Sequence, residues 1–192
     1  MFSTGFFMYV FVSSFTPGPN NMMSMHNASK FGFVRTVRFV LGAASGFFLI
    51  SLLCGLFNVV LRQYLPSITG VMNALGCLYM LFLAYAIAIS KPGREGETRE
   101  LNSFRAGVAL QFLNAKGILY ALSAISTFVM PFDDSWRTLL LTALILGGTA
   151  VLSAGSWALF GGIFSRFLGK YHRPFQAVMA LMLVYGAISV YL

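Results

Sequence analysis

The chain has 192 residues, of which 58% are hydrophobic and only 9% are charged, and its formal net charge is +8. A soluble domain is about one quarter charged, so this composition excludes an ordinary water-soluble fold and indicates a membrane protein. The positive residues lie between apolar runs and do not form a single stripe, which argues against nucleic acid as a partner.

Six apolar runs make up most of the chain, and each is long enough to cross the hydrocarbon core of a bilayer, which needs roughly 20 helical residues. The runs lack the alternation of polarity that marks the strands of a membrane β-barrel. We therefore expect an all-α integral membrane protein with six transmembrane helices. The predicted spans, in chain order, cover about residues 2–29, 37–61, 65–90, 104–130, 138–164 and 174–192.

Two prolines and a glycine interrupt the first span. Proline lacks a backbone N–H group and breaks the helical ladder, so carbonyl and amide groups are freed at membrane depth. Such groups are tolerated only where protein or a water-filled cavity satisfies them. A simple proline kink is the alternative, but a kink does not require the two asparagines that follow. We predict that this segment binds substrate through Thr16, Pro17, Gly18, Pro19, Asn20 and Asn21.

The second and third spans each contain one cysteine, Cys54 and Cys77. Their spacing is neither a disulfide framework nor a set of metal ligands, so we expect no metal site and interpret both as packed small residues. A membrane thiol-disulfide electron carrier is an alternative function, because neighbouring helices can bring the two thiols together. Neither cysteine adjoins a helix break or a basic residue that would raise its reactivity.

The fourth span contains a lysine. Lys116 lies about eleven residues past Arg105, or ~16 Å along a helix. A lysine near the bilayer centre costs roughly 2.5–3.5 kcal/mol on insertion scales, so it normally faces a partner or a cavity. A shifted span, with the lysine at the membrane interface, is the alternative. Three polar residues within a turn of Lys116 complete the predicted binding site, namely Gln111, Asn114 and Tyr120.

The chain also resembles two related halves. The sequence LAYA at 83–86 is echoed by LVYG at 183–186, and the break in the first span matches 112–114 in the fourth. Chance similarity in a biased composition is the alternative. Because each half has three helices, the second half would be inverted relative to the first. We predict one transporter domain, 1–192, with repeat 1 at about 1–90, a cytoplasmic loop at about 91–103 and repeat 2 at about 104–192, and with interrupted helices in the first and fourth spans.

The basic residues predict the orientation in the membrane. Lys and Arg in short loops are retained in the cytoplasm. Only Arg62 and Arg137 lie on one side, whereas the loops on the other side hold Lys30, Arg35, Arg38, Lys91, Arg94, Arg99, Arg105, Arg166, Lys170 and Arg173. We therefore expect a multi-pass protein of the bacterial inner membrane with both termini outside, in the periplasm.

Two motifs resemble a known family. TPGPNN after a short apolar helix, followed by a basic turn and Gly32-Phe33, resembles the LysE/RhtB family of amino-acid exporters. The pattern FxxGxxLQxxNxK at 104–116 resembles the second motif of that family, and LQF at 110–112, STF at 126–128 and LVY at 183–185 are most similar to its cysteine/O-acetylserine exporter branch. The resemblance covers essentially the whole chain. It implies proton-driven export of small amino acids or derivatives and a homodimer in the lipid bilayer, with no enzymatic activity and no cofactor.

Two departures from the family pattern bear on the substrate. Many members have proline where this chain has Ala115, and many have an acid where Phe47 follows Gly46. No Asp or Glu lies within any predicted span, so Lys116 is the main candidate for proton coupling and His26 is the second. Because no acid is available for a second positive charge, we expect small neutral amino acids and not lysine or arginine. A non-transporting scaffold is the remaining alternative, in which Lys116 and the asparagines would tolerate alanine.

Overall fold

The computed structural model describes residues 2–58, 100–163 and 172–189, together with helical positions 74, 77–78, 81–82, 84–85 and 87–89. Every regular element within these residues is helical. The predicted third span and the loop after it lie largely outside the described residues. The elements in chain order are α1 (Thr4–Phe15), α2 (Pro19–Phe31), α3 (Phe33–Leu56), the short 3-10 helix η1 (Glu100–Asn102), α6 (Phe104–Leu113), α7 (Ala115–Phe128), α8 (Trp136–Ile163) and α10 (His172–Ser189).

Two of these helices, α3 and α8, are long and apolar enough to cross a membrane. The pair α6 and α7 makes a third candidate span, bent by 69° where the two helices meet. The described residues thus give two to three candidate spans in an all-helical membrane protein. Both predicted helix interruptions, in the first and the fourth span, are present in the structure.

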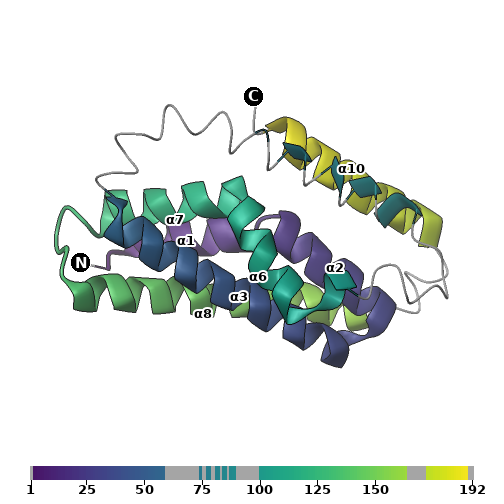
Figure 1. Ribbon diagram of the computed structural model, residues 1–192, viewed down its shortest axis with the longest axis horizontal. Coiled ribbons are helices and arrows are strands. Elements are labelled where there is room, and N and C mark those ends of the chain that lie inside the picture. The colour runs from purple at the N-terminus through teal and green to yellow at the C-terminus, as the bar shows by residue number, and fades with distance from the viewer. Residues whose placement is uncertain are drawn as a thin grey trace.

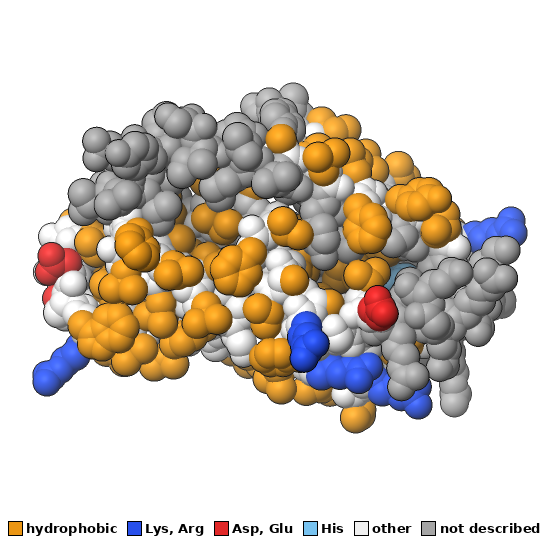
Figure 2. Space-filling view, viewed as in Figure 1, with side chains coloured by type: hydrophobic (Ala, Val, Ile, Leu, Met, Phe, Trp, Pro, Cys, Tyr) orange, Lys and Arg blue, Asp and Glu red, His pale blue; other side chains and the backbone are white. Residues whose placement is uncertain are grey.

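The outer surface is apolar along most of its length. Large side chains such as Met8 on α1, Leu41 on α3 and Leu152 on α8 are exposed, and Figure 2 shows hydrophobic atoms across the long middle of the molecule. An exposed apolar surface of this extent marks contact with a membrane or with another protein. Lys and Arg side chains gather mainly toward one end of the same view (Figure 2).

Glycines let the helices approach to backbone contact. A side chain at Gly42 of α3 would clash with the backbone of Phe104, and one at Gly107 of α6 would clash with the backbone of Phe39. Gly161 of α8 lies equally close to the backbone of Met25 in α2. Small residues of this kind allow close packing where the hydrophobic effect does not drive association. They hold α2, α6 and α8 close together around α3 (Figure 1).

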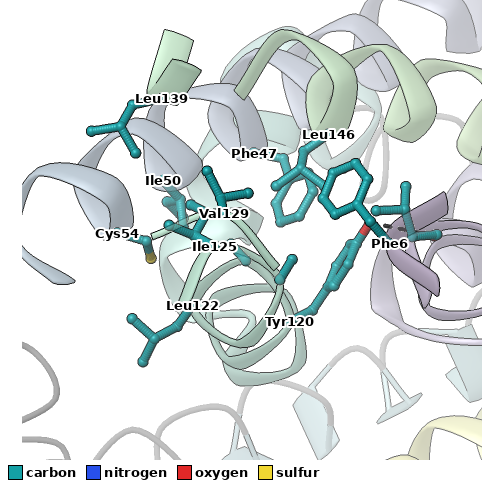
Figure 3. Close-up of a cluster of buried hydrophobic side chains, with 13 residues drawn as sticks. Phe6, Phe47, Ile50, Cys54, Tyr120, Leu122, Ile125, Val129, Leu139 and Leu146 are labelled. Carbon is teal, nitrogen blue, oxygen red and sulfur yellow. Dashed lines mark hydrogen bonds between the residues drawn. The ribbon is translucent and has the colours of Figure 1, made fainter. Parts of the chain in front are cut away.

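Two buried clusters flank the helix breaks. One joins α1, α3, α7 and α8 and includes Phe6, Phe47 and Tyr120 (Figure 3). The other joins α2, α3, α6 and α10 and includes Met22 and Leu183. Along both broken helices the break lies between residues of the first cluster and residues of the second. The packing therefore fixes each half-helix separately and leaves the polar breaks between two apolar cores.

The start of α3 differs from the prediction. The second span was expected from about residue 37, but α3 begins at Phe33, directly after Gly32. Gly32 has φ +85°, a conformation that glycine adopts without strain, so the chain turns within one residue. Consequently Arg35 and Arg38 lie in the first turns of α3 and not in a loop. The Arg38 Nε atom donates to the Asn102 carbonyl at 2.8 Å, which ties η1 to α3.

Candidate functional site

The first break is built by the backbone of Thr16, Pro17 and Gly18. Thr16 is extended, with ψ 147°, and Gly18 is fully extended at φ −172° and ψ 174°. Helix α2 then begins with Pro19, and proline is favoured at a first helical position because its missing N–H group would have no helical acceptor there. The Met22 N–H donates to the Gly18 carbonyl at 3.0 Å, which closes the first turn.

The break frees the carbonyls of residues 13–17. The Thr16 hydroxyl donates to the Ser13 carbonyl at 3.1 Å, and side chains from other elements donate to the remaining four. Asn21 Nδ2 donates to the carbonyls of Ser14 at 2.8 Å and Thr16 at 3.0 Å. From α8, the Ser153 hydroxyl donates to the Ser14 carbonyl at 2.6 Å, and Trp157 Nε1 donates to Phe15 at 3.3 Å. The last donor is the ammonium of α7, described below. Unpaired carbonyls are costly away from water, so these donors stabilise the broken helix.

The second break is centred on Asn114, whose backbone lies between α6 and α7 with φ −90° and ψ 85°. Its side-chain Oδ1 accepts from the Gly117 N–H at 3.2 Å, so Asn114 caps the start of α7. Asparagine is among the strongest N-cap residues. The break therefore forms with Ala115 in the place where a proline would otherwise enforce it.

Lys116 joins the two breaks. Its Nζ donates to the Thr16 hydroxyl at 2.8 Å and to the carbonyls of Pro17 at 3.3 Å and Thr16 at 3.4 Å. A lysine ammonium has three N–H donors, and these three acceptors match that number. The only charged side chain among the described lining residues is thus held on carbonyls that the first break frees.

A second contact between the breaks is an amide pair. Asn20 Nδ2 donates to Gln111 Oε1 at 3.0 Å, and Gln111 Nε2 donates back to Asn20 Oδ1 at 2.7 Å. Gln111 is fully buried. Since both amides are occupied by each other, this pair acts as a cross-brace between α2 and α6.

A cavity of about 50 Å³ lies between the breaks, with room for a few water molecules at roughly 10–15 Å³ each. Every residue predicted for the binding site lines it except Pro17, which contributes its carbonyl to Lys116, and Gln111, which lies behind Asn20. His26 is buried in α2 and is not among the lining residues. The lining comprises Ser13, Ser14, Thr16, Gly18, Pro19, Asn20, Asn21, Ala43, Phe47, Asn114, Lys116, Gly117, Tyr120, Ala150, Ser153 and Ala154.

Tyr120 forms one wall of this cavity. Its ring stacks on Phe47 with centroids 5.4 Å apart, and its hydroxyl donates to the Val10 carbonyl at 3.3 Å. Figure 3 shows both rings within the buried cluster between α1, α3, α7 and α8. Phe47, which occupies the position where many exporters of the resembled family have an acid, therefore faces the cavity with an apolar ring.

The α8 contribution was not predicted from the sequence. Ser153 lines the cavity and bonds the broken helix, and Trp157 donates to it from one turn further along. The sequence signal was weak, because the fifth span also contains Thr142, Thr149 and Ser156. Which face of the helix Ser153 and Trp157 occupy follows only from how α8 packs on α2 and α3.

The cysteines do not take part in this site. Both are free, and Cys54 is buried with its Sγ 4.0 Å from the Ile118 carbonyl. Across the described parts of the chain, no group of three His, Cys, Asp or Glu side chains is placed to hold a metal ion. The cavity between the breaks presents hydrogen-bond donors, backbone acceptors and one ammonium. These groups are suited to binding a small polar molecule.

Comparisons with known proteins show which family the chain belongs to. Residues 11–192 match the family described as LysE type translocator. The chain is 33% identical over 188 residues to the cysteine/O-acetylserine efflux protein of Escherichia coli strain K12, a match that covers 98% of this chain and 96% of the relative. The proteins of the same name from Shigella sonnei and Shigella flexneri give the same identity and coverage. No solved structure matches the chain. This chain therefore belongs to the LysE type translocator family, and it is a membrane transporter and not an enzyme.

Proposed function

We propose that this translocator exports small neutral amino acids or their derivatives, of the cysteine and O-acetylserine kind, across the bacterial inner membrane. The names of its relatives support the substrate class. The observation that carries the proposal is the Lys116 ammonium beside a small cavity whose described lining contains no acid. A site of that kind has a partner for a carboxylate and none for a second positive side chain.

In the proposed pose, the carboxylate of the substrate binds Lys116 and the start of α2. The first-turn N–H groups of Asn20 and Asn21 have no acceptor within the helix, and helix N-termini favour anions. The ammonium of the substrate binds the carbonyls of Thr16 and Pro17. Asn114 and Gln111 are weaker candidates for the ammonium, because Asn114 Oδ1 caps α7 and Gln111 Oε1 is bonded to Asn20.

The substrate side chain would face the apolar wall. Ala43, Ala150 and Ala154 line that wall together with Phe47. The cavity of about 50 Å³ leaves little room, and these apolar side chains offer no charge. The wall supports a short, uncharged side chain, in line with the expectation that lysine and arginine are poor substrates.

We extend the proposal to the topology of the whole chain. Six spans form two inverted repeats, at about 1–90 and 104–192, joined by a cytoplasmic loop, with both termini in the periplasm. The corresponding breaks in the first and fourth spans, and the reciprocal amides of Asn20 and Gln111, support this arrangement. Inverted repeats with discontinuous helices commonly place the substrate at the repeat interface. Proton coupling through Lys116 or His26, and a homodimer, belong to the same proposal.

An export assay tests the function. Cells that overproduce the protein are loaded with a panel of labelled amino acids, and efflux is followed with and without a proton uncoupler. We expect export of cysteine, O-acetylserine or another small neutral amino acid, and loss of export with the uncoupler. Export of lysine and arginine in preference to all neutral substrates would overturn the proposed substrate class, and efflux that is indifferent to the uncoupler would overturn proton coupling.

A further inference from the structure

We propose that Lys116 occupies the ammonium site of the substrate when the transporter is empty, and that an arriving amino acid displaces it. This inference rests on the proposed function and adds a mechanism for selectivity. The carbonyls that suit the ammonium of a substrate, those of Thr16 and Pro17, are already bonded by the ammonium of the protein's own lysine.

The acceptors match an ammonium closely. The Thr16 hydroxyl, the Thr16 carbonyl and the Pro17 carbonyl lie 2.8, 3.4 and 3.3 Å from Lys116 Nζ. A primary ammonium of any molecule presents the same three donors. We call these three acceptors, two carbonyls and one hydroxyl, the acceptor cage. Gly18 keeps the approach open, because a Cβ atom at that position would lie 3.2 Å from Nζ and 3.4 Å from Cδ of Lys116.

Two ammonium groups do not fit in the cage together. Like charges a few ångströms apart repel each other. The charged and titratable groups of the described lining are Lys116 itself and the Tyr120 phenol, and the lining residues from α1, α2, α3 and α8 are all neutral. No carboxylate of the lining offsets a second positive charge, so one ammonium must leave when the other binds.

Displacement costs little only if the lysine finds a new partner. Lys116 is half-buried, and a charge at membrane depth without a partner is unfavourable. The carboxylate of an amino acid supplies that partner within the same small cavity. In the empty state Lys116 satisfies the freed carbonyls, and in the loaded state the substrate ammonium satisfies them while Lys116 binds the carboxylate. A plain amine displaces the lysine without replacing its partner. Lys116 therefore favours the binding of an amino acid over the binding of an amine that has the same side chain but no carboxylate.

The test uses a matched pair of ligands on the purified full-length protein. L-Cysteine and cysteamine differ only by the carboxylate, and both are applied at pH 7 with a reductant, with binding measured by calorimetry and thermal shift. We expect the wild type to bind cysteine and to reject cysteamine. Lys116→Met should reverse this order, with cysteamine bound at least about tenfold more tightly than by the wild type. Adding Thr16→Val to Lys116→Met should reduce that gain, because one of the three acceptors is lost.

The outcomes separate this inference from the proposed function. Absence of amino-acid binding by the wild type counts against the proposed function, whereas the cysteamine gain of Lys116→Met concerns the cage alone. A folded Lys116→Met protein that gains no affinity for cysteamine overturns the inference. Lys116→Gln, which keeps a neutral polar group, provides the same test if the methionine variant does not fold, with a smaller gain expected. Lys30→Met is the matched control, since it removes a lysine outside the cavity lining and should leave cysteamine binding unchanged.

Discussion

The two helix breaks differ in what they contribute. The first, between α1 and α2, is made by two prolines and supplies carbonyl acceptors that other elements must satisfy. The second, between α6 and α7, is made by Asn114 capping its own helix, and it supplies the Lys116 donor. The first break therefore supplies hydrogen-bond acceptors, and the second supplies the charged donor that binds them. The two breaks hold complementary chemistry and not identical chemistry.

Removing the donor is the change that breaks this complementarity most. Lys116→Met should lower export by more than about 100-fold, because hydrogen bonds to charged groups contribute roughly 1.5–3 kcal/mol each and the carboxylate loses its partner as well. Efflux of labelled substrate from cells is the measurement, with membrane insertion checked by fractionation. Lys30→Met is the control and should retain export. Full export by a correctly inserted Lys116→Met protein would remove Lys116 from the mechanism.

The amide pair of Asn20 and Gln111 connects the two breaks and should contribute to the free energy of unfolding. Asn20→Ala should lower the free energy of unfolding by roughly 1–3 kcal/mol, because it leaves the fully buried Gln111 amide without its partner. A double-mutant cycle with Gln111→Ala separates this pair from other effects. Thermal unfolding in detergent gives the four values of the cycle. Strictly additive losses would show that the two amides are not coupled.

The first break was predictable from the sequence because its cause is covalent. Pro17 and Pro19 cannot donate to the helical ladder in any fold, and the asparagines after them have no role in a bend. The second break was harder to predict, because Ala115 does not enforce it. What produces it is the direction of the Asn114 side chain, which depends on local backbone geometry and not on residue type alone.

The α8 side of the site was not predictable in the same way. Ser153 and Trp157 lie in the fifth span, far along the chain from the prolines of the first, and their contacts depend on the packing of α8 against α2. The early start of α3 was missed because the positive φ of Gly32 allows a turn of a single residue, which a search for loops between apolar runs does not detect. Orientation and inverted symmetry stay predictions, since they rest on charge counts and short sequence echoes.

The cap of the second break is expected to contribute less than the brace. Asn114→Ala should destabilise the protein by roughly 1 kcal/mol, the typical value of an N-cap side chain, because the Gly117 N–H loses its acceptor. Asn114→Ser restores a capping oxygen and should recover most of that loss. Thermal unfolding of the three proteins is the measurement. An export defect in Asn114→Ser without a loss of stability would indicate that the amide itself binds substrate.

The start of α8 lies outside the two breaks, and there a carboxylate supports the residue that caps the helix. Ser135 directly precedes α8, and its hydroxyl accepts from the Thr138 N–H at 3.4 Å. Asp133 accepts from the Ser135 N–H at 2.9 Å and from the Thr138 hydroxyl at 2.5 Å. The hydrogen bond from Thr138, followed by those from Ser135, lowers the pKa of the Asp133 carboxyl below its ordinary value of 3.8. A lowered pKa means that the stabilisation is complete above about pH 3.8 and is lost as the pH falls further.

The effect of this carboxylate should be the smallest of the series, because it lies at the protein surface, where solvent screens its interactions. Asp133→Asn should remove the part of the acid-induced loss of stability that occurs below about pH 3.8 while leaving export at neutral pH unchanged. Thermal unfolding between acidic and neutral pH measures this, with Asp134→Asn as the control that removes the same charge one position later. An equal change in both variants would mean that the loss of a negative charge, and not the loss of the hydrogen bonds to Asp133, is responsible. The two helix starts therefore differ for a physical reason. At the surface a carboxylate can support the start of α8. Beside Lys116 the cap is the neutral amide of Asn114, which leaves the ammonium to the acceptors of the first break.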